Sequence, residues 1–366
     1  MVIPQADPKR CFDAVREDIH RAIQRVFERG LFILGPETEA FEAEFAAFLG
    51  VRHAIGVSSG TDAVALALTA AGLTKGDEVI TVSLTAVATA IAIEEAGGIP
   101  RFVDIDPATR CMDPLTLAAA IGPRTAAIVP VHLHGFPAPM DAILAVARPR
   151  GLLIIEDCAQ AHGATYRGRR VGSFGHAAAF SFYPTKNLGA AGDAGAVVTG
   201  DAAIAERVRR LRLYGWDDQR VTIGPGSNRR LDELQAAVLR ILLTRLEASN
   251  GERRLLAAQF RSCLEGLPLE LPPDDGGAVY HQFAIGVDGR TALQDFMASR
   301  GVQTGAHYPV GVHQQPRFAS GAPALPVTER LSERLMSLPI QPEIARDHVP
   351  HICRILAEGV SRWGRS

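Results

Sequence analysis

The chain has 366 residues, of which 47% are hydrophobic and 21% are charged, enough apolar surface for one large core and a smaller second one. This composition argues against an intrinsically disordered protein. The formal net charge of −2, without a stripe of lysine and arginine interleaved with aromatic residues, disfavours nucleic acid as a partner.

The N-terminal segment and the cysteines indicate in which cellular compartment the protein is found. Met1–Gly30 carries many charges and lacks the apolar stretch of a signal peptide, and no later segment reaches the roughly 18 uncharged apolar residues of a membrane span. The five cysteines are scattered and never form a C-x-x-C pair, which argues against a disulfide framework and a zinc site. We expect a cytoplasmic protein without a membrane partner.

Two helices are predicted first, an amphipathic one over Ala14–Arg29 and a second over Pro36–Leu49. Helical stretches such as Thr61–Ala71 and Thr85–Ala96 then alternate with short apolar runs. Strands separated by helices favour a mostly parallel sheet covered on both faces, the α/β class. The predicted strands are His53–Val57, Glu78–Val82, Ile99–Val103, Ala126–Val131, Leu152–Glu156, Ala178–Phe182 and Gly195–Thr199.

The last third of the chain predicts a smaller α+β domain. A long helical tract, Leu231–Leu264, leads to the loop Pro268–Gly277, which is rich in proline, aspartate and glycine. Beyond it, His281–Val287 is expected to be a strand, and Thr291–Arg300 and Val349–Gly359 are expected to be helices. We therefore divide the chain into a large α/β domain, residues 1–245, and a small C-terminal domain, residues 246–366.

Lys186 is the first candidate for chemistry. It lies in the segment Ser181–Asn187, just after an apolar strand, in a sequence that contains few lysines. A lysine at a strand end near a cleft forms a Schiff base with an aldehyde cofactor or a keto substrate if its surroundings lower its pKa. The alternative, which this segment alone favours, is a solvated surface lysine.

Asp157 is the second candidate, because Leu152–Gln160 places it at the carboxyl end of a buried apolar strand. A buried carboxylate there needs a positive partner. A protonated pyridine nitrogen would be such a partner, and the pair would keep the ring an electron sink. The alternative is that Asp157 caps the following helix.

The turn Ser58–Asp62 is the third candidate. It links a strand to an apolar helix, so that amides and hydroxyl groups converge at a helix N-terminus, where a phosphate is stabilised. Many turns of this composition bind no ligand, so the segment is weak evidence by itself.

Other polar clusters predict no metal site. His132, His134 and His162 lie close to the Asp157 strand in sequence, but their spacing fits no tetrahedral cage, and we expect packing or cleft-wall roles, with His162 nearer a cofactor. Asp104 and Asp106 are expected to end a strand and begin a turn.

In order and spacing, these segments resemble the DegT/DnrJ/EryC1/StrS family of sugar aminotransferases. This family is a branch of the fold-type I, aspartate-aminotransferase-like enzymes that depend on pyridoxal 5'-phosphate (PLP). The resemblance implies that fold, with helices on both faces of a central sheet and a smaller C-terminal domain. The matching segments are Gly35–Glu37, Phe41–Glu42, Ser59–Thr61, Gly76–Ile80, Glu156–Gln160, Ser181–Asn187, Asn228–Ala236, Tyr308–Pro309, His313–Pro316 and Leu338–Pro339.

The resemblance also implies roles. Lys186 would carry the cofactor and move the proton, Asp157 would pair with the pyridine nitrogen, and Gln160 would lie near the phenolic oxygen. Asn228 would reach the phosphate of the neighbouring subunit, which implies a homodimer with shared active sites. The phosphate would further be held by Gly60, Thr61 and Ser181, and the sugar-nucleotide entrance would be lined by Tyr308, His313 and Arg230.

Three positions depart from the family pattern. Thr85–Thr89 has alanine where many relatives stack an aromatic residue on the ring, leaving Leu84 or Val87 as weak substitutes. The sequence of this segment also resembles that of the family branch that acts on deoxysugars with a keto group at carbon 3. Gly192–Gly195 replaces a common Glu-Gly-Gly, and Arg229 fills a slot usually held by a smaller or aromatic residue.

The function implied by the resemblance is transfer of an amino group, with glutamate as the expected donor, onto a keto-deoxysugar nucleotide such as a dTDP-3-keto-6-deoxyhexose. A non-nucleotide keto sugar or a cyclitol is an alternative acceptor. A PLP-dependent sugar dehydratase is a rival that Lys186 disfavours, because such enzymes carry histidine there. A PLP-binding regulator without turnover is the remaining alternative.

Overall fold

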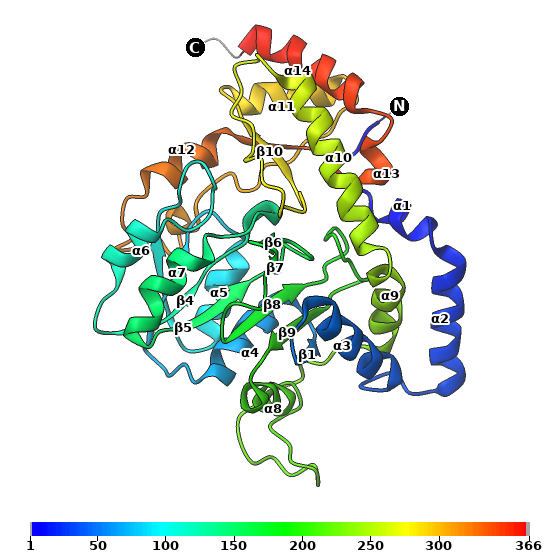
Figure 1. The fold of residues 1–366 in the computed structure, drawn as a ribbon, viewed down its shortest axis with the longest axis vertical. Helices are drawn as coiled ribbons and strands as arrows, with labels where there is room; N and C mark the ends of the chain where they lie inside the picture. Colours follow the sequence, from blue (N-terminus) through cyan, green and yellow to red (C-terminus); the bar gives the residue numbers. More distant parts are fainter. Residues whose placement is uncertain (1, 364–366) are drawn as a thin grey trace.

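A seven-stranded β-sheet lies at the centre of the molecule (Figure 1). The computed structural model describes residues 2–363, and the strand order is β1-β9-β8-β5-β4-β2-β3. Neighbours from β8 to β3 are parallel, whereas β9 is antiparallel to both β1 and β8. The predicted α/β class is confirmed. The strands are β1 (His53–Val57), β2 (Glu78–Val82), β3 (Ile99–Val103), β4 (Thr125–Val129), β5 (Leu153–Asp157), β8 (Ala177–Ser181) and β9 (Gly195–Thr199).

Successive residues of each strand enter different hydrophobic clusters, because side chains alternate across a sheet. In β9, Val197 packs with α4 (Gly60–Ala71) and α8 (Ala202–Leu211). Ala196 and Val198 pack on the opposite face, with α3 (Pro36–Leu49) and α9 (Glu233–Leu243). Both faces are therefore covered, which explains the nearly continuous apolar runs that predict these strands.

The predicted helical tract Leu231–Leu264 is two helices, α9 and α10 (Leu246–Leu264), with a break at residues 244 and 245. The predicted domain boundary falls at this break. The largest hydrophobic cluster nevertheless runs from Ile80 in β2 to Leu356 in α14, so the C-terminal elements share a core with the sheet. The strands of this part, β10 (Phe283–Gly286) and β11 (Leu335–Leu338), are antiparallel.

The remaining elements surround this frame. Helices α1, α2, α10, α13 and α14 lie on the upper and right-hand sides in Figure 1. Their bounds, with those of the other helices and of the short hairpin β6–β7, are α1 (Pro8–Asp13), α2 (Arg16–Arg29), α5 (Val87–Glu95), α6 (Pro114–Ala120), α7 (Met140–Ala147), α11 (Arg290–Ser299), α12 (Pro326–Arg334), α13 (Pro342–Ala345), α14 (Val349–Trp363), β6 (Thr165–Tyr166), β7 (Arg169–Arg170) and the 3₁₀ turns Leu133–Gly135, Arg148–Arg150 and Val312–Gln314.

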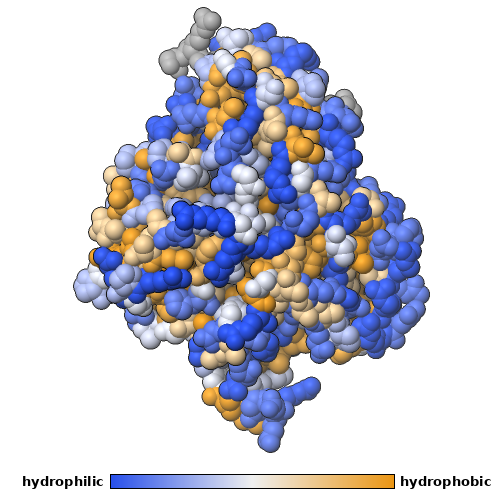
Figure 2. Space-filling view, in the orientation of Figure 1, coloured by the Kyte–Doolittle hydropathy of each residue, from blue (hydrophilic) through white to orange (hydrophobic). Residues whose placement is uncertain are grey.

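A projecting segment, residues 213–228, connects α8 to the approach to α9 and is called the arm here (Figure 1). Backbone bridges pair Leu213 with Asn228 and Trp216 with Thr222. Val221 and Ile223 are 53% and 56% exposed, and Figure 2 shows hydrophobic surface at this end of the molecule. The arm therefore carries partly exposed apolar side chains.

Two further findings bear on the sequence analysis. Within residues 2–363, none of the helices combines the length and the hydrophobicity that a bilayer crossing requires. The five cysteines, all in the described part of the chain, are free thiols, and Cys111, Cys158 and Cys353 are buried.

The aromatic cluster under α3 gives a stability prediction. Phe45 is fully buried, and its ring centroid lies 5.1 Å from that of Phe180 and 5.3 Å from that of Phe182. Phe45→Ala should lower the free energy of unfolding by about 3–5 kcal/mol, because it leaves a cavity between α3 and the sheet. Urea unfolding followed by circular dichroism measures this. Leu255→Ala, at a 67% exposed position, is the control, and an equal loss in both variants would contradict the assignment.

Candidate active site

The carboxyl ends of β5 and β8 meet the N-terminus of α4 at one edge of the sheet. Ligands of open α/β sheets bind outside the carboxyl ends of the strands. A cavity of about 270 Å³ lies here. It is lined by Ser59, Gly60, Thr61, Val64, Ala86, Ala88, Thr89, Asp157, Ala159, Ser181, Tyr183, Lys186 and Asp193. Five of the predicted site residues, Gly60, Thr61, Asp157, Ser181 and Lys186, are therefore brought together.

Asp157 is the last residue of β5 and is 5% exposed. Its Oδ2 accepts a hydrogen bond from Thr89 Oγ1 at 2.8 Å, and its Oδ1 accepts one from the Ala159 amide at 3.0 Å. No cationic side chain within residues 2–363 forms an ion pair with it. The carboxylate therefore caps a turn and also faces the cavity without a counter-ion.

Lys186 follows β8 in a turn in which its amide donates to the Tyr183 carbonyl at 2.9 Å. The side chain is half-buried. Burial lowers the pKa of the Lys186 ammonium from 10.5 to about 8, although the negative charge of Asp157 opposes this shift. A neutral amine near pH 8 is a nucleophile and a base, so Lys186 is not a solvated surface lysine.

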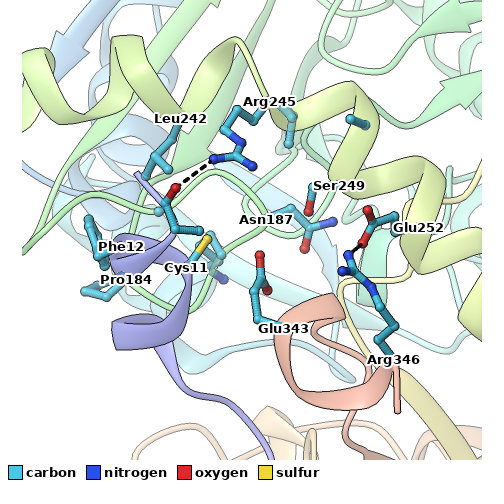
Figure 3. A pocket seen from close by; sticks show the side chains of 15 residues that line it. Cys11, Phe12, Pro184, Asn187, Leu242, Arg245, Ser249, Glu252, Glu343 and Arg346 are labelled. Atoms are coloured by element: carbon cyan, nitrogen blue, oxygen red, sulfur yellow. Dashed lines mark hydrogen bonds and ion pairs between the residues drawn. The ribbon is translucent and has the colours of Figure 1, made fainter. Parts of the chain in front are cut away.

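A second cavity, of about 110 Å³, also reaches Lys186 (Figure 3). Residues of α1, α10 and α13 line it. Arg245 donates to the carbonyl of Ala14 across its rim, and Arg346 forms an ion pair with Glu252. Lys186 therefore lines both cavities, and space lies next to it in each of them.

The N-terminus of α4 forms the third part of the site. Ser59 caps the helix by accepting a hydrogen bond from the Asp62 amide at 3.1 Å. A side chain at Gly60 would place its Cβ 2.5 Å from the Cβ of Ser181, so only glycine allows this approach. The first amides of α4 and the Ser181 hydroxyl therefore share one corner, an arrangement that suits a phosphate.

Gln160 and Tyr308 are also brought together. The Gln160 amide donates to the Tyr308 hydroxyl at 2.9 Å and its oxygen accepts from the His134 amide at 2.7 Å. Burial and the charge of Asp157 raise the pKa of Tyr308 to about 12. Neither residue lines the cavity, although Gln160 follows Asp157 by three positions in the chain.

The other predicted site residues lie apart from the cavity of their own chain. Asn228 is exposed at the base of the arm. The Arg230 guanidinium lies 5.8 Å from the ring centroid of Tyr214. Both ring nitrogens of His313 are engaged, Nδ1 with Ser83 at 2.6 Å and Nε2 with Glu329 at 3.1 Å. Their cofactor and substrate roles stay predictions.

A model of the DegT/DnrJ/EryC1/StrS aminotransferase family matches residues 13–357. The chain belongs to this family. It is 46% identical to a dTDP-3-amino-3,4,6-trideoxy-alpha-D-glucose transaminase of Streptomyces venezuelae, over 99% of this chain and 96% of that protein. It is 44% identical to a UDP-N-acetyl-3-dehydro-alpha-D-glucosamine 3-aminotransferase of Acidithiobacillus ferrooxidans, over 97% of each chain.

Among solved structures, S. venezuelae DesV in complex with a ketimine intermediate superposes with a TM-score of 0.96 at 46% identity, covering 99% of both chains. The predicted fold-type I architecture is therefore confirmed.

Several cavity residues of this family member were not singled out from the sequence. Thr89 orients Asp157, and Ala88 and Ala159 present methyl groups to the cavity. The suggested stacking substitutes do not line it, since Leu84 is fully buried in the main core and Val87 packs in another cluster. The only sequence signal for Thr89 is a hydroxyl one helical turn after Thr85, beyond the end of β2.

His132, Glu156 and Cys158 place three possible metal ligands within 4.8 Å. The carboxylate oxygens of Glu156 and the ring nitrogens of His132 are already engaged in hydrogen bonds. Glu156 accepts hydrogen bonds from His132 and from the amides of the 172–175 loop, while His132 Nδ1 accepts from the Ala138 amide. Glu156 and His132 therefore hold the 172–175 loop in place, and neither keeps an oxygen or nitrogen free for an ion.

The lowered pKa of Lys186 gives a direct prediction. In cofactor-free protein, acylation of Lys186 by an amine-reactive reagent should rise with a half-maximal rate near pH 8, because burial disfavours the ammonium form. Asp157→Asn should shift the half-maximum lower still, since the Asp157 charge favours the ammonium. Mass spectrometry of the Lys186 peptide measures both, with exposed Lys75 as the internal control. A half-maximum at the usual value for lysine would contradict the assignment.

Proposed function

We propose that this chain is a PLP-dependent aminotransferase that moves an amino group from glutamate onto a keto-deoxysugar nucleotide. The observation that carries the proposal is one cavity lined by three complementary groups. These are a lysine whose pKa is lowered to about 8, a buried carboxylate without a counter-ion, and the N-terminus of a helix. Family membership supports the same chemistry.

The residues of the cavity fit this cofactor. The first amides of α4 at Gly60 and Thr61, together with the Ser181 hydroxyl, would hold its phosphate. Asp157 would pair with the protonated pyridine nitrogen, which would provide the missing counter-ion. When bound, the cofactor supplies an aldehyde that takes up the amino group and a protonated ring that spreads negative charge.

Lys186 and Asp157 then divide the proton chemistry. With a pKa of about 8, Lys186 Nζ is neutral in about a tenth of the molecules at pH 7 and can accept a proton from carbon and return it to a neighbouring carbon. Asp157, held by Thr89, would keep the ring nitrogen protonated. Gln160 and Tyr308 would donate to the phenolic oxygen or to the substrate.

Carbon 3 is the proposed site of amination. The two curated relatives are named for different nucleotides and different sugars, yet both names place the nitrogen at carbon 3. We therefore propose a 3-keto-deoxyhexose, carried by dTDP as in the S. venezuelae relative, as the acceptor. The transaminase names and the retained Lys186 both argue against the sugar dehydratase.

A homodimer with shared sites is part of the proposal. Asn228 is exposed and lies outside the cavity of its own chain, at the base of an arm with exposed Val221 and Ile223. A second copy that covers the arm would bury this apolar surface and would bring Asn228 to the partner's phosphate site.

The spectrum of the holoprotein tests the function. Purified protein should show the visible absorption of bound PLP, glutamate should convert it to the aminated form, and a dTDP-3-keto-6-deoxyhexose should reverse the change and yield the amino sugar by mass spectrometry. Lys186→Ala should lower turnover by about 10²–10⁴-fold, whereas Lys75→Ala should not. UDP-linked and 4-keto sugars are the comparison acceptors. A product that loses a hydroxyl without gaining nitrogen would instead support the dehydratase, and a protein that takes up no PLP would refute the proposal.

Complementation tests the shared site. A heterodimer of one Lys186→Ala subunit and one Asn228→Ala subunit, purified with two affinity tags, places both changes in one site and leaves the other intact. It should therefore keep about half of the wild-type activity, although each homodimer is impaired. If Lys186 and Asn228 served the same chain's site, both sites of the heterodimer would carry one change, and its activity would not exceed that of the two homodimers.

A further inference from the structure

Asp62 places a negative charge in the first turn of the helix that would bind the phosphate. It is the third residue of α4, two positions after Gly60. Its Oδ2 accepts hydrogen bonds from the hydroxyls of Ser58 and of Ser59, the latter at 3.0 Å. These two hydroxyls are therefore turned towards Asp62. A carboxylate in the first turn stabilises the helix through its dipole, but it repels a phosphate dianion bound at the same turn.

Arg229 faces this carboxylate. Its Nη1 lies 3.0 Å from Asp62 Oδ1, and its Nη2 lies 3.4 Å from Glu95 Oε2 at the end of α5. The side chains of Arg229 and Asp62 are only 25% and 21% exposed, so solvent screens this pair less than a surface pair. The Arg229 guanidinium therefore bridges α4 and α5.

The backbone around Arg229 connects this bridge to the arm. The Arg229 amide donates to the Arg212 carbonyl at 3.1 Å, Asn228 pairs with Leu213, and Arg230 pairs with Val57 at the end of β1. The base of the arm is thus fixed to the body on both sides of Arg229. Arginine at this slot departs from the smaller or aromatic residue expected from the family pattern.

We propose that Arg229 is a positioning residue for the cofactor phosphate, which acts through Asp62. It balances the Asp62 charge, so that the N-terminus of α4 keeps its attraction for a dianion. This inference rests on the proposed PLP chemistry, but it concerns a residue that does not line the cavity of its own chain.

The role is distinguishable from simple tethering by its dependence on the Asp62 charge. If Arg229 acts by charge, its removal weakens binding of a phosphorylated ligand and spares the same ring without phosphate, and removal of the Asp62 charge should rescue the loss. If Arg229 only tethers the arm, a displaced Asn228 would also weaken phosphate binding, in the neighbouring subunit, but removal of the Asp62 charge should not rescue it.

The experiment measures the dissociation constants of cofactor-free protein for PLP and for pyridoxal, which lacks the phosphate. Arg229→Ala should weaken PLP binding roughly tenfold at low salt, less at high salt, and leave pyridoxal binding unchanged. Asp62→Asn keeps an oxygen to accept from the serines and should bind PLP at least as tightly as the wild type. The double variant should return to within about twofold of the wild type.

Arg124→Ala is the matched control, because it removes an arginine from Glu78 at the opposite end of β2 and should leave both constants unchanged. Equal weakening of PLP and pyridoxal in Arg229→Ala, an unchanged PLP constant, or a double variant as weak as Arg229→Ala would each overturn the inference. Wild-type protein that binds no PLP would instead refute the proposed function, so the two failures are separable.

Discussion

The rest of the site depends on one buried negative charge without a counter-ion. Asp157 ends β5 with two hydrogen bonds, from Thr89 and from the Ala159 amide, and with no cation paired to it in the described chain. A buried carboxylate is stabilised by a positive partner, so a cationic ligand in the cavity would suit Asp157. Its field also acts on Lys186 and Tyr308, whose pKa values it raises. One strand end therefore influences every ionisable group proposed for the chemistry.

The fold makes such a strand end possible by very close packing. Gly60 lets α4 approach Ser181, and a Cβ on Gly195 would lie 2.3 Å from the Ser59 carbonyl oxygen. Ala177 and Ala179 of β8 are buried beneath this helix and keep it near the sheet. The same packing buries most of β8, just before the turn that holds Lys186. Burial lowers the pKa of Lys186, so core packing contributes to the reactivity of this lysine.

Most strands of the sheet could be predicted from the sequence, because strands buried on both faces are short apolar runs with clear ends. β1, β2, β3 and β9 begin and end at the predicted residues, while β5 and β8 are shifted by one. The break between α9 and α10 was missed, since neither proline nor glycine marks it. Thr89 was missed for a different reason: its bond to Asp157 joins residues 68 positions apart, and no local pattern reports such a contact. For the same reason, the sequence did not reveal that Ser83 and Glu329 engage both ring nitrogens of His313.

The position of Arg229 shows how a departure from a family pattern can be accommodated. A new arginine beside a cofactor site would ordinarily add an uncompensated charge, yet here Asp62 and Glu95 already lie within 3.0 and 3.4 Å of its guanidinium. The acid at the third position of α4 is useful to the helix and unfavourable to a phosphate, and an opposing cation removes that conflict. Because backbone hydrogen bonds and bridges already hold the base of the arm on both sides of Arg229, replacement of this side chain is expected to change the electrostatics of the phosphate site and to leave the arm in place.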